Sequence, residues 1–232
     1  MNVRSERWAI SSGIAFTVLF VAGLLVTFGN LPSYNNDDPV AKVDAAVRST
    51  YADSGSRLAI ILGAVIIVVS AGALLWFVSG LHARMARHGA SKVTRDVLLG
   101  AGIVAAASIV AGATALASIA GDLSVGNDPP IDSADVMRVL PELGYPLILL
   151  GAMMAIAVVI GITTMLALRA QLLPRWLGYA GWIAVIGAVL ALSFVTMVLV
   201  GLWFLIVGII AALDRLPQPA EVSVPDRSGV DA

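Results

Sequence analysis

The sequence predicts an all-α fold, a polytopic membrane bundle of six transmembrane helices. Five long apolar stretches alternate with charged connections, and none of these stretches contains Asp, Glu, Lys or Arg. The 232-residue chain is 59% hydrophobic and 12% charged, with a mean hydropathy of +0.94, whereas soluble domains carry about 25% charged residues. Because charges are costly inside a bilayer, such long uncharged stretches are expected to lie in lipid.

Four apolar stretches have the length of a single pass, since about 20 helical residues cross the hydrocarbon core. The fifth, 177–213, would be about 55 Å long as one helix, so a turn is expected near Ser193 to Thr196. These helices form one domain over residues 1–213, and a disordered tail is expected over 214–232, which is rich in proline, serine and glycine. The predicted helices are 8–28, 58–80, 97–120, 145–168, 177–193 and 196–213.

The N-terminal run could be a signal peptide, because Arg4 and Arg7 precede it. The run from Trp8 to Phe28 is longer than the roughly 7 to 15 apolar residues of a signal peptide, which favours a first membrane helix. Ten of the fourteen Lys and Arg residues lie in the N-terminal segment, the second and fourth loops and the tail, and nine of the fifteen acids lie in the first and third loops. The positive-inside rule therefore predicts that both termini are cytoplasmic.

The first and third loops, predicted to be outside, each carry a short amphipathic helix. In the first loop Asp38 suits an N-cap and Pro39 the first helical position. In the third loop Asp132 is expected to cap a helix over 133–140, which Pro141 would end. The apolar face of the first of these helices is formed by Val40, Val43, Val47 and Tyr51.

The sequence holds little chemistry. It has no cysteine, which excludes disulfides and thiolate sites, and no nucleophile, zinc or phosphate-binding motif. His82 and His88 are six residues apart, so a helix places them on different faces. The acidic loop residues match no EF-hand and suit turns and caps better than Ca²⁺. A net charge of −1 gives no basic surface for nucleic acid. We therefore expect a non-enzymatic protein without a catalytic residue, metal or cofactor.

Small residues are concentrated in several predicted helices, and small residues let membrane helices approach closely. They are most frequent in 97–120, which is therefore expected at the bundle centre. The second helix is expected to continue to Arg87 and to end at Gly89. The candidate packing residues are Gly102, Ala106, Gly112, Gly178, Gly181, Gly201 and Gly208. Basic residues at the predicted cytoplasmic face are candidate contacts for lipid headgroups. They are Arg84, Arg87, Lys92, Arg95 and Arg175.

Three functions stay open. The small-residue helix faces favour an accessory or partner subunit, or a scaffold, that packs against another membrane protein or a second copy of itself. The alternative is a binder or carrier of lipid or another hydrophobic small molecule, in a cavity lined by Met153, Met154 and Met165. The third is a transporter, although no charged residue or broken helix marks a midplane site.

Three segments have a recognisable pattern: Leu172-Leu173-Pro174-Arg175-Trp176-Leu177-Gly178, the run from Leu75-Trp76-Phe77 to Leu81, and the pair Tyr145-Pro146. Together they resemble a family of uncharacterised multi-pass membrane proteins of high-GC Gram-positive (actinobacterial-type) bacteria. The resemblance implies a bacterial cytoplasmic membrane and no known activity. Membrane lipids are expected as partners because the chain is predicted to span the bilayer.

Overall fold

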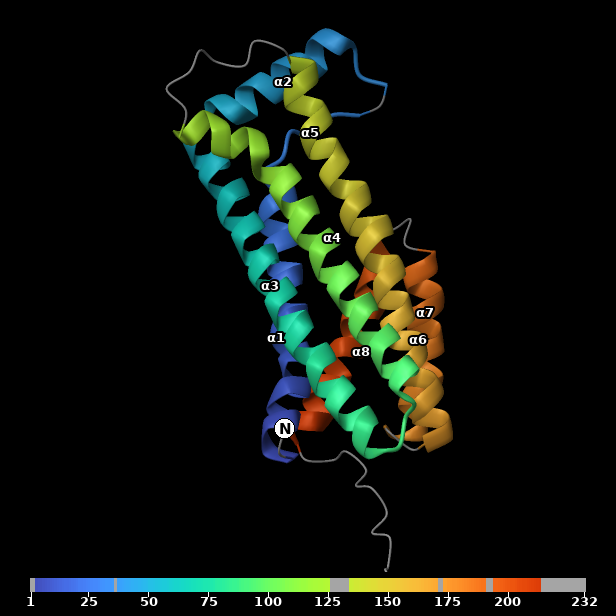
Figure 1. The fold of residues 1–232 in the computed structure, drawn as a ribbon. Helices are drawn as coiled ribbons and strands as arrows, with labels where there is room; N and C mark the ends of the chain where they lie inside the picture. Colours follow the sequence, from blue (N-terminus) through green and yellow to red (C-terminus); the bar gives the residue numbers. More distant parts are fainter. Residues whose placement is uncertain (1–2, 36, 126–133, 171–172, 191–193, 214–232) are drawn as a thin grey trace, which may run out of the picture.

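The computed structural model describes residues 3–35, 37–125, 134–170, 173–190 and 194–213, and these contain helices and no strand. Figure 1 shows a long bundle, with α2 lying across one end and the N-terminus at the other. The helices are α1 (Val3–Phe28), α2 (Val40–Ala52), α3 (Ser54–Arg87), α4 (Lys92–Val125), α5 (Ala134–Pro146), the π-helix η1 (Leu147–Ala152), α6 (Met153–Ala170), α7 (Arg175–Val189) and α8 (Phe194–Ala212).

Six of the helices form a closed ring. Contacts run from α1 to α3, α4, α6, α7 and α8 in turn, and α8 returns to α1. Aromatic side chains fill part of the interior: the Phe204 ring lies 4.9 Å from the rings of both Phe16 and Phe77, and Trp203 is only 3% exposed. The prediction that 97–120 is central is wrong, because α4 is one member of the ring and its Ile103 and Val104 are about half exposed.

Within the described residues, four helical segments are long and apolar enough to cross a membrane: Arg4–Phe28, Ser54–Arg87, Lys92–Val125 and Asp135–Arg169. The helices also expose apolar side chains outward, such as Leu62, Val65 and Trp76 on α3, each more than half exposed. This surface suits lipid rather than water. The bundle therefore has the character of a membrane protein, as the sequence predicts.

The last two helices differ from the predicted pair. With 15 residues, α7 spans about 22 Å, less than the roughly 30 Å hydrocarbon core. It ends at Val189, four residues before Ser193, which lies outside the described residues. The next helix, α8, begins at Phe194, inside the predicted turn. Helix α7 therefore ends four residues before the predicted position 193, and α8 begins two residues before the predicted position 196.

Pro141 does not end its helix, contrary to the prediction. The helix runs from α5 through η1 into α6, with Pro141 and Pro146 both inside α5. Each proline lacks the N–H that would bond to the carbonyl four residues earlier. The π-helix Leu147–Ala152 follows Pro146 directly, and a local π turn is one way for a helix to continue past such a defect. The predicted cap Asp132 lies outside the described residues.

Two predictions about helix ends had different outcomes. The end of α3 is confirmed: Gly89 has a φ of 73°, which glycine adopts without strain, and the Gly89 and Ala90 amides bond back to Ala86 and Met85. Asp38 does not cap α2. Its carboxylate accepts from the Asn35 amide instead, at 2.9 Å. These local bonds close the loop before α2 and hold the pKa of Asp38 below its usual value.

Candidate functional site

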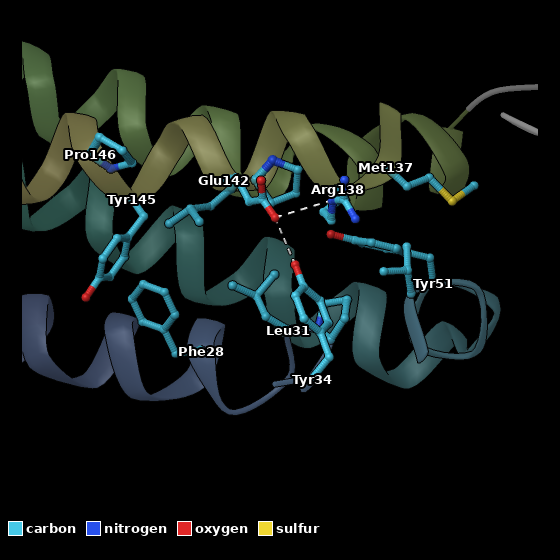
Figure 2. A pocket seen from close by; sticks show the side chains of 13 residues that line it. Phe28, Leu31, Tyr34, Tyr51, Met137, Arg138, Glu142, Tyr145 and Pro146 are labelled. Carbon is cyan, nitrogen blue, oxygen red and sulfur yellow. Dashed lines mark hydrogen bonds and ion pairs between the residues drawn. The ribbon is translucent and has the colours of Figure 1, made fainter. Parts of the chain in front are cut away.

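A pocket lies beneath α2, at the end of the bundle opposite the N-terminus (Figure 2). Its volume is about 260 Å³, slightly below the roughly 300 Å³ at which drug-sized ligand sites begin. The walls come from the end of α1, the loop that follows it, α2, α4 and α5. The lining residues are Phe28, Leu31, Pro32, Tyr34, Val47, Tyr51, Leu116, Met137, Arg138, Pro141, Glu142, Tyr145 and Pro146.

The roof of the pocket is held by the apolar face of α2. Val43, Val47 and Tyr51 are four residues apart, so they share one helix face, and each is at most 6% exposed. They pack in a small cluster with Ile60 and Met137, among others, separate from the main core of the ring. The face predicted from the sequence is therefore the one that docks, except that Val40 is exposed.

The corner between α2 and α3 fixes the position of Tyr51. The Arg57 Nη1 donates to the Tyr51 carbonyl at 2.7 Å, and the Asp53 carboxylate accepts from the Ser56 amide at 2.7 Å, which caps α3. The Ser56 amide is the chief cause that lowers the pKa of Asp53. Tyr51 therefore enters the pocket from a rigid corner.

A polar edge closes one side of the pocket. The Tyr34 hydroxyl donates to Glu142 Oε1 at 3.0 Å, and Arg138 Nε lies 3.5 Å from the same oxygen. Arg138 also lies 3.6 Å from Asp135, at Nη2. Burial, and then the bond to Glu142, raise the pKa of Tyr34. Figure 2 shows this edge joining the loop after α1 to α5, so two distant parts of the sequence meet there.

The Tyr51 hydroxyl is the unusual polar group of the pocket. The side chain is 2% exposed, and its hydroxyl has no hydrogen-bond partner among the described residues. Figure 2 shows the hydroxyl directed inward, between Arg138 and the other lining side chains. Burial, with a smaller effect of Tyr34, raises the pKa of Tyr51 to about 12. The group is therefore a neutral donor at physiological pH.

The lining of the pocket is suited to an apolar molecule. Its surface is mostly aliphatic, aromatic and proline side chains, with polar groups at one edge. The described part of the chain holds no group of His, Asp and Glu side chains placed to hold a metal ion. An apolar enclosure with a few converging polar groups is the usual form of a small-molecule site.

The candidate packing residues all lie where helices of this chain meet. A methyl group at Gly102 would come within 2.7 Å of Val78, and one at Gly112 within 2.8 Å of the Gly144 carbonyl. The others lie in similar places: Ala106 is 4% exposed, Gly178 faces Leu168, Gly181 faces Thr164, Gly201 faces Thr17 and Gly208 faces Ile14. These small residues serve contacts within the bundle.

One candidate for headgroup contact is wrong. Arg84 is 4% exposed and pairs with Glu6, 3.3 Å away, so it faces the protein and not the lipid. Arg87 shares the same carboxylate but is partly exposed. The other three are accessible to different degrees: Lys92 and Arg175 are exposed, and Arg95 is half-buried.

Glu6 is the residue that the sequence analysis missed. It is 1% exposed, at the start of α1, and its two oxygens face Arg84 and Arg87 of α3. A buried charge is rarely tolerated without such partners. The signal in the sequence was a lone acid between Arg4 and Arg7, but its partners are about 80 positions away in the chain. The ion pairs join α1 to α3 at the N-terminal end of the bundle.

The methionine cavity predicted for a lipid is wrong. Met153 is buried beside a void of about 20 Å³, room for little more than one water molecule. Met154 and Met165 are 50% and 44% exposed on the surface of α6. The larger pocket lies instead under α2. Its walls come from segments more than 100 residues apart, such as Leu31 and Glu142, so their meeting could not be predicted from helix periodicity.

No family model matches the sequence, and neither a curated protein nor a solved structure has a significant likeness to it.

Proposed function

We propose that this protein binds a small hydrophobic molecule, such as a lipid chain, in the pocket beneath α2. The observation that carries the proposal is a pocket of about 260 Å³ whose lining side chains are mostly apolar. An apolar ligand gains free energy by leaving water, and a preformed pocket avoids part of the ordering cost. The function is non-enzymatic, since the lining residues offer no assembled set of nucleophile and base.

The membrane setting of the proposal extends the charge pattern of the sequence. Six passes, with both termini on the cytoplasmic side of a bacterial plasma membrane, would place α2 and the pocket outside. Ten Lys and Arg residues lie in the N-terminal segment, the second and fourth loops and the tail, against four in the first and third loops, and this difference supports the orientation. A ligand could then enter from the outer leaflet or from beyond it.

The structure gives the partner-subunit hypothesis less support than the binding hypothesis. The partner-subunit hypothesis was based on the small-residue helix faces, and those residues contact neighbouring helices of the same chain. Exposed apolar side chains remain around the bundle, but a lipid-facing surface has this character without a partner. Binding in the pocket is therefore the function that the geometry favours.

Photolabelling of the full-length protein in lipid nanodiscs tests the proposal. The probe is dodecane carrying a diazirine, and labelled peptides are mapped by mass spectrometry. We expect labelling within the lining segments 28–34 and 137–146. Leu31→Trp, which adds bulk at a partly buried wall position, should suppress it.

Leu62→Trp is the matched control, because Leu62 is 51% exposed on α3 and does not line the pocket. It should leave the pocket labelling unchanged. Equal labelling of the lining segments in the wild type and in Leu31→Trp would count against the proposed site, since it would show contact from the surrounding lipid alone.

A further inference from the structure

The buried Tyr51 hydroxyl restricts the chemistry of the ligand. A buried hydroxyl that forms no hydrogen bond destabilises the protein, and Tyr51 Oη has no partner among the described residues. Its own position is well determined, because Arg57 binds the Tyr51 carbonyl and α2 docks through Val43 and Val47. The Tyr51 side chain lines the pocket, and its hydroxyl is covered by protein, so a bound molecule reaches the hydroxyl when the covering side chains move aside.

The hydroxyl offers a donor. The raised pKa keeps it protonated at physiological pH, and the neighbouring acceptor, Glu142, already receives the Tyr34 hydroxyl. The complementary group on a ligand is therefore a hydrogen-bond acceptor, such as a carbonyl or ether oxygen.

The charges at the polar edge favour an acceptor without charge. Arg138 is the cation that lines the pocket among the described residues, and it lies between two carboxylates, those of Asp135 and Glu142. The three groups together carry a net charge of −1. An anionic ligand would have to displace a carboxylate from Arg138 or accept repulsion from both acids. A neutral acceptor meets neither cost.

We infer that the pocket selects a neutral ester or similar carbonyl-bearing lipid, whose oxygen accepts the hydrogen bond of Tyr51 while its hydrocarbon chain occupies the apolar walls. This inference rests on the proposed function, because it names the ligand class of the same pocket. Tyr51 is then the residue that determines specificity, and Tyr34, Arg138 and Glu142 form the edge that disfavours anions.

Competition against the diazirine-dodecane probe tests the inference in nanodiscs of the full-length protein. Three competitors share a 12-carbon chain and differ at one end: dodecane, dodecyl acetate and dodecanoate, each at the same mole fraction in the bilayer. We expect dodecyl acetate to displace the probe from the lining segments at about five-fold lower concentration than dodecane, the effect of one net hydrogen bond. Dodecanoate should be a weaker competitor than the ester.

Tyr51→Phe removes the hydroxyl and keeps the ring. In this variant dodecyl acetate should displace the probe only at the concentration that dodecane requires, and labelling by the probe alone should persist. Tyr179→Phe is the matched control, because Tyr179 is 65% exposed on α7 and does not line the pocket, and it should keep the ester preference. The melting temperature of each variant checks that the fold is intact.

The possible failures are distinguishable. An ester no better than dodecane, an ester preference that survives Tyr51→Phe, or a preference for dodecanoate overturns the ligand class while leaving an apolar site in place. Loss of pocket labelling altogether, in the wild type and without any competitor, refutes the proposed function and the ligand class with it.

Discussion

Removal of the negative charge of Glu6 is expected to destabilise the bundle strongly. Its carboxylate is 1% exposed and faces two guanidinium groups of α3, those of Arg84 and Arg87. Glu6→Gln keeps the shape of the side chain and one acceptor oxygen but removes the charge. Arg84, itself 4% exposed, would then remain in a site from which water is largely excluded.

The burial of both partners determines the size of the effect. Exposed ion pairs contribute about 0 to 1 kcal/mol, whereas loss of one member of a buried pair costs about 3 to 5 kcal/mol, because the remaining charge is uncompensated. Glu6 and Arg84 belong to the second class. For a chain of this size, 3 kcal/mol corresponds to a fall of about 6 °C or more in melting temperature.

The assay is thermal unfolding of the purified protein in one detergent, followed by tryptophan fluorescence. Glu142→Gln is the matched control, since the Glu142 side chain is 55% exposed in its pair with Arg138, and it should change stability by less than about 1 kcal/mol. The double variant Glu6→Gln/Arg84→Met should recover part of the loss, because it removes the uncompensated charge. Equal melting temperatures for Glu6→Gln and Glu142→Gln would refute the reasoning.

Three further outcomes are expected. Gly112→Ala should destabilise by about 1 to 3 kcal/mol because its methyl group would meet backbone 2.8 Å away, whereas Gly100→Ala, on an open face of the described α4, should be neutral or stabilising in the same melts. Burial lowers the pKa of His88 in the folded protein below its ordinary value of 6.5. Between the folded and the unfolded pKa of His88 the unfolded chain binds more protons, so the stability of the fold should fall as the pH drops through this window. The difference in melting temperature between pH 7.5 and pH 5.5 should therefore be smaller in His88→Gln than in the wild type. Because the chain has no cysteine, single variants Ser49→Cys and Lys92→Cys report sidedness, and labelling of both from the same side by a membrane-impermeant maleimide would contradict the proposed topology.

The local features of the fold were predictable because they depend on near neighbours in the sequence. Runs of apolar residues predicted the helices, the glycine after His88 predicted the end of α3, and the spacing of Val43, Val47 and Tyr51 predicted the docking face of α2. Each of these signals lies within a few residues of the structure it determines. The lengths of α3 and α4 were underestimated, since each has 34 residues and includes polar ends beyond the apolar stretch.

The features that the sequence analysis missed depend on contacts between distant segments. Glu6 is tolerated because α3 brings Arg84 and Arg87 to it. Pro141 was expected to end a helix, but packing of α5 against α4 and α2 can offset the loss of a backbone bond. The pocket forms where Tyr34 meets Glu142, 108 positions away in the chain. None of these pairings has a local pattern.

The π-helix between α5 and α6 also changes the relative rotation of two surfaces. An ordinary helix turns by about 100° per residue, so one extra residue accommodated in a wider turn rotates everything after it by about that angle. The side of α5 that lines the pocket and the side of α6 that faces the ring are therefore offset by about 100° from the positions that an unbroken α-helix would give them, although they belong to one continuous helix. One helix thereby presents its pocket residues and its contacts with α4 and α7 on the faces that each requires.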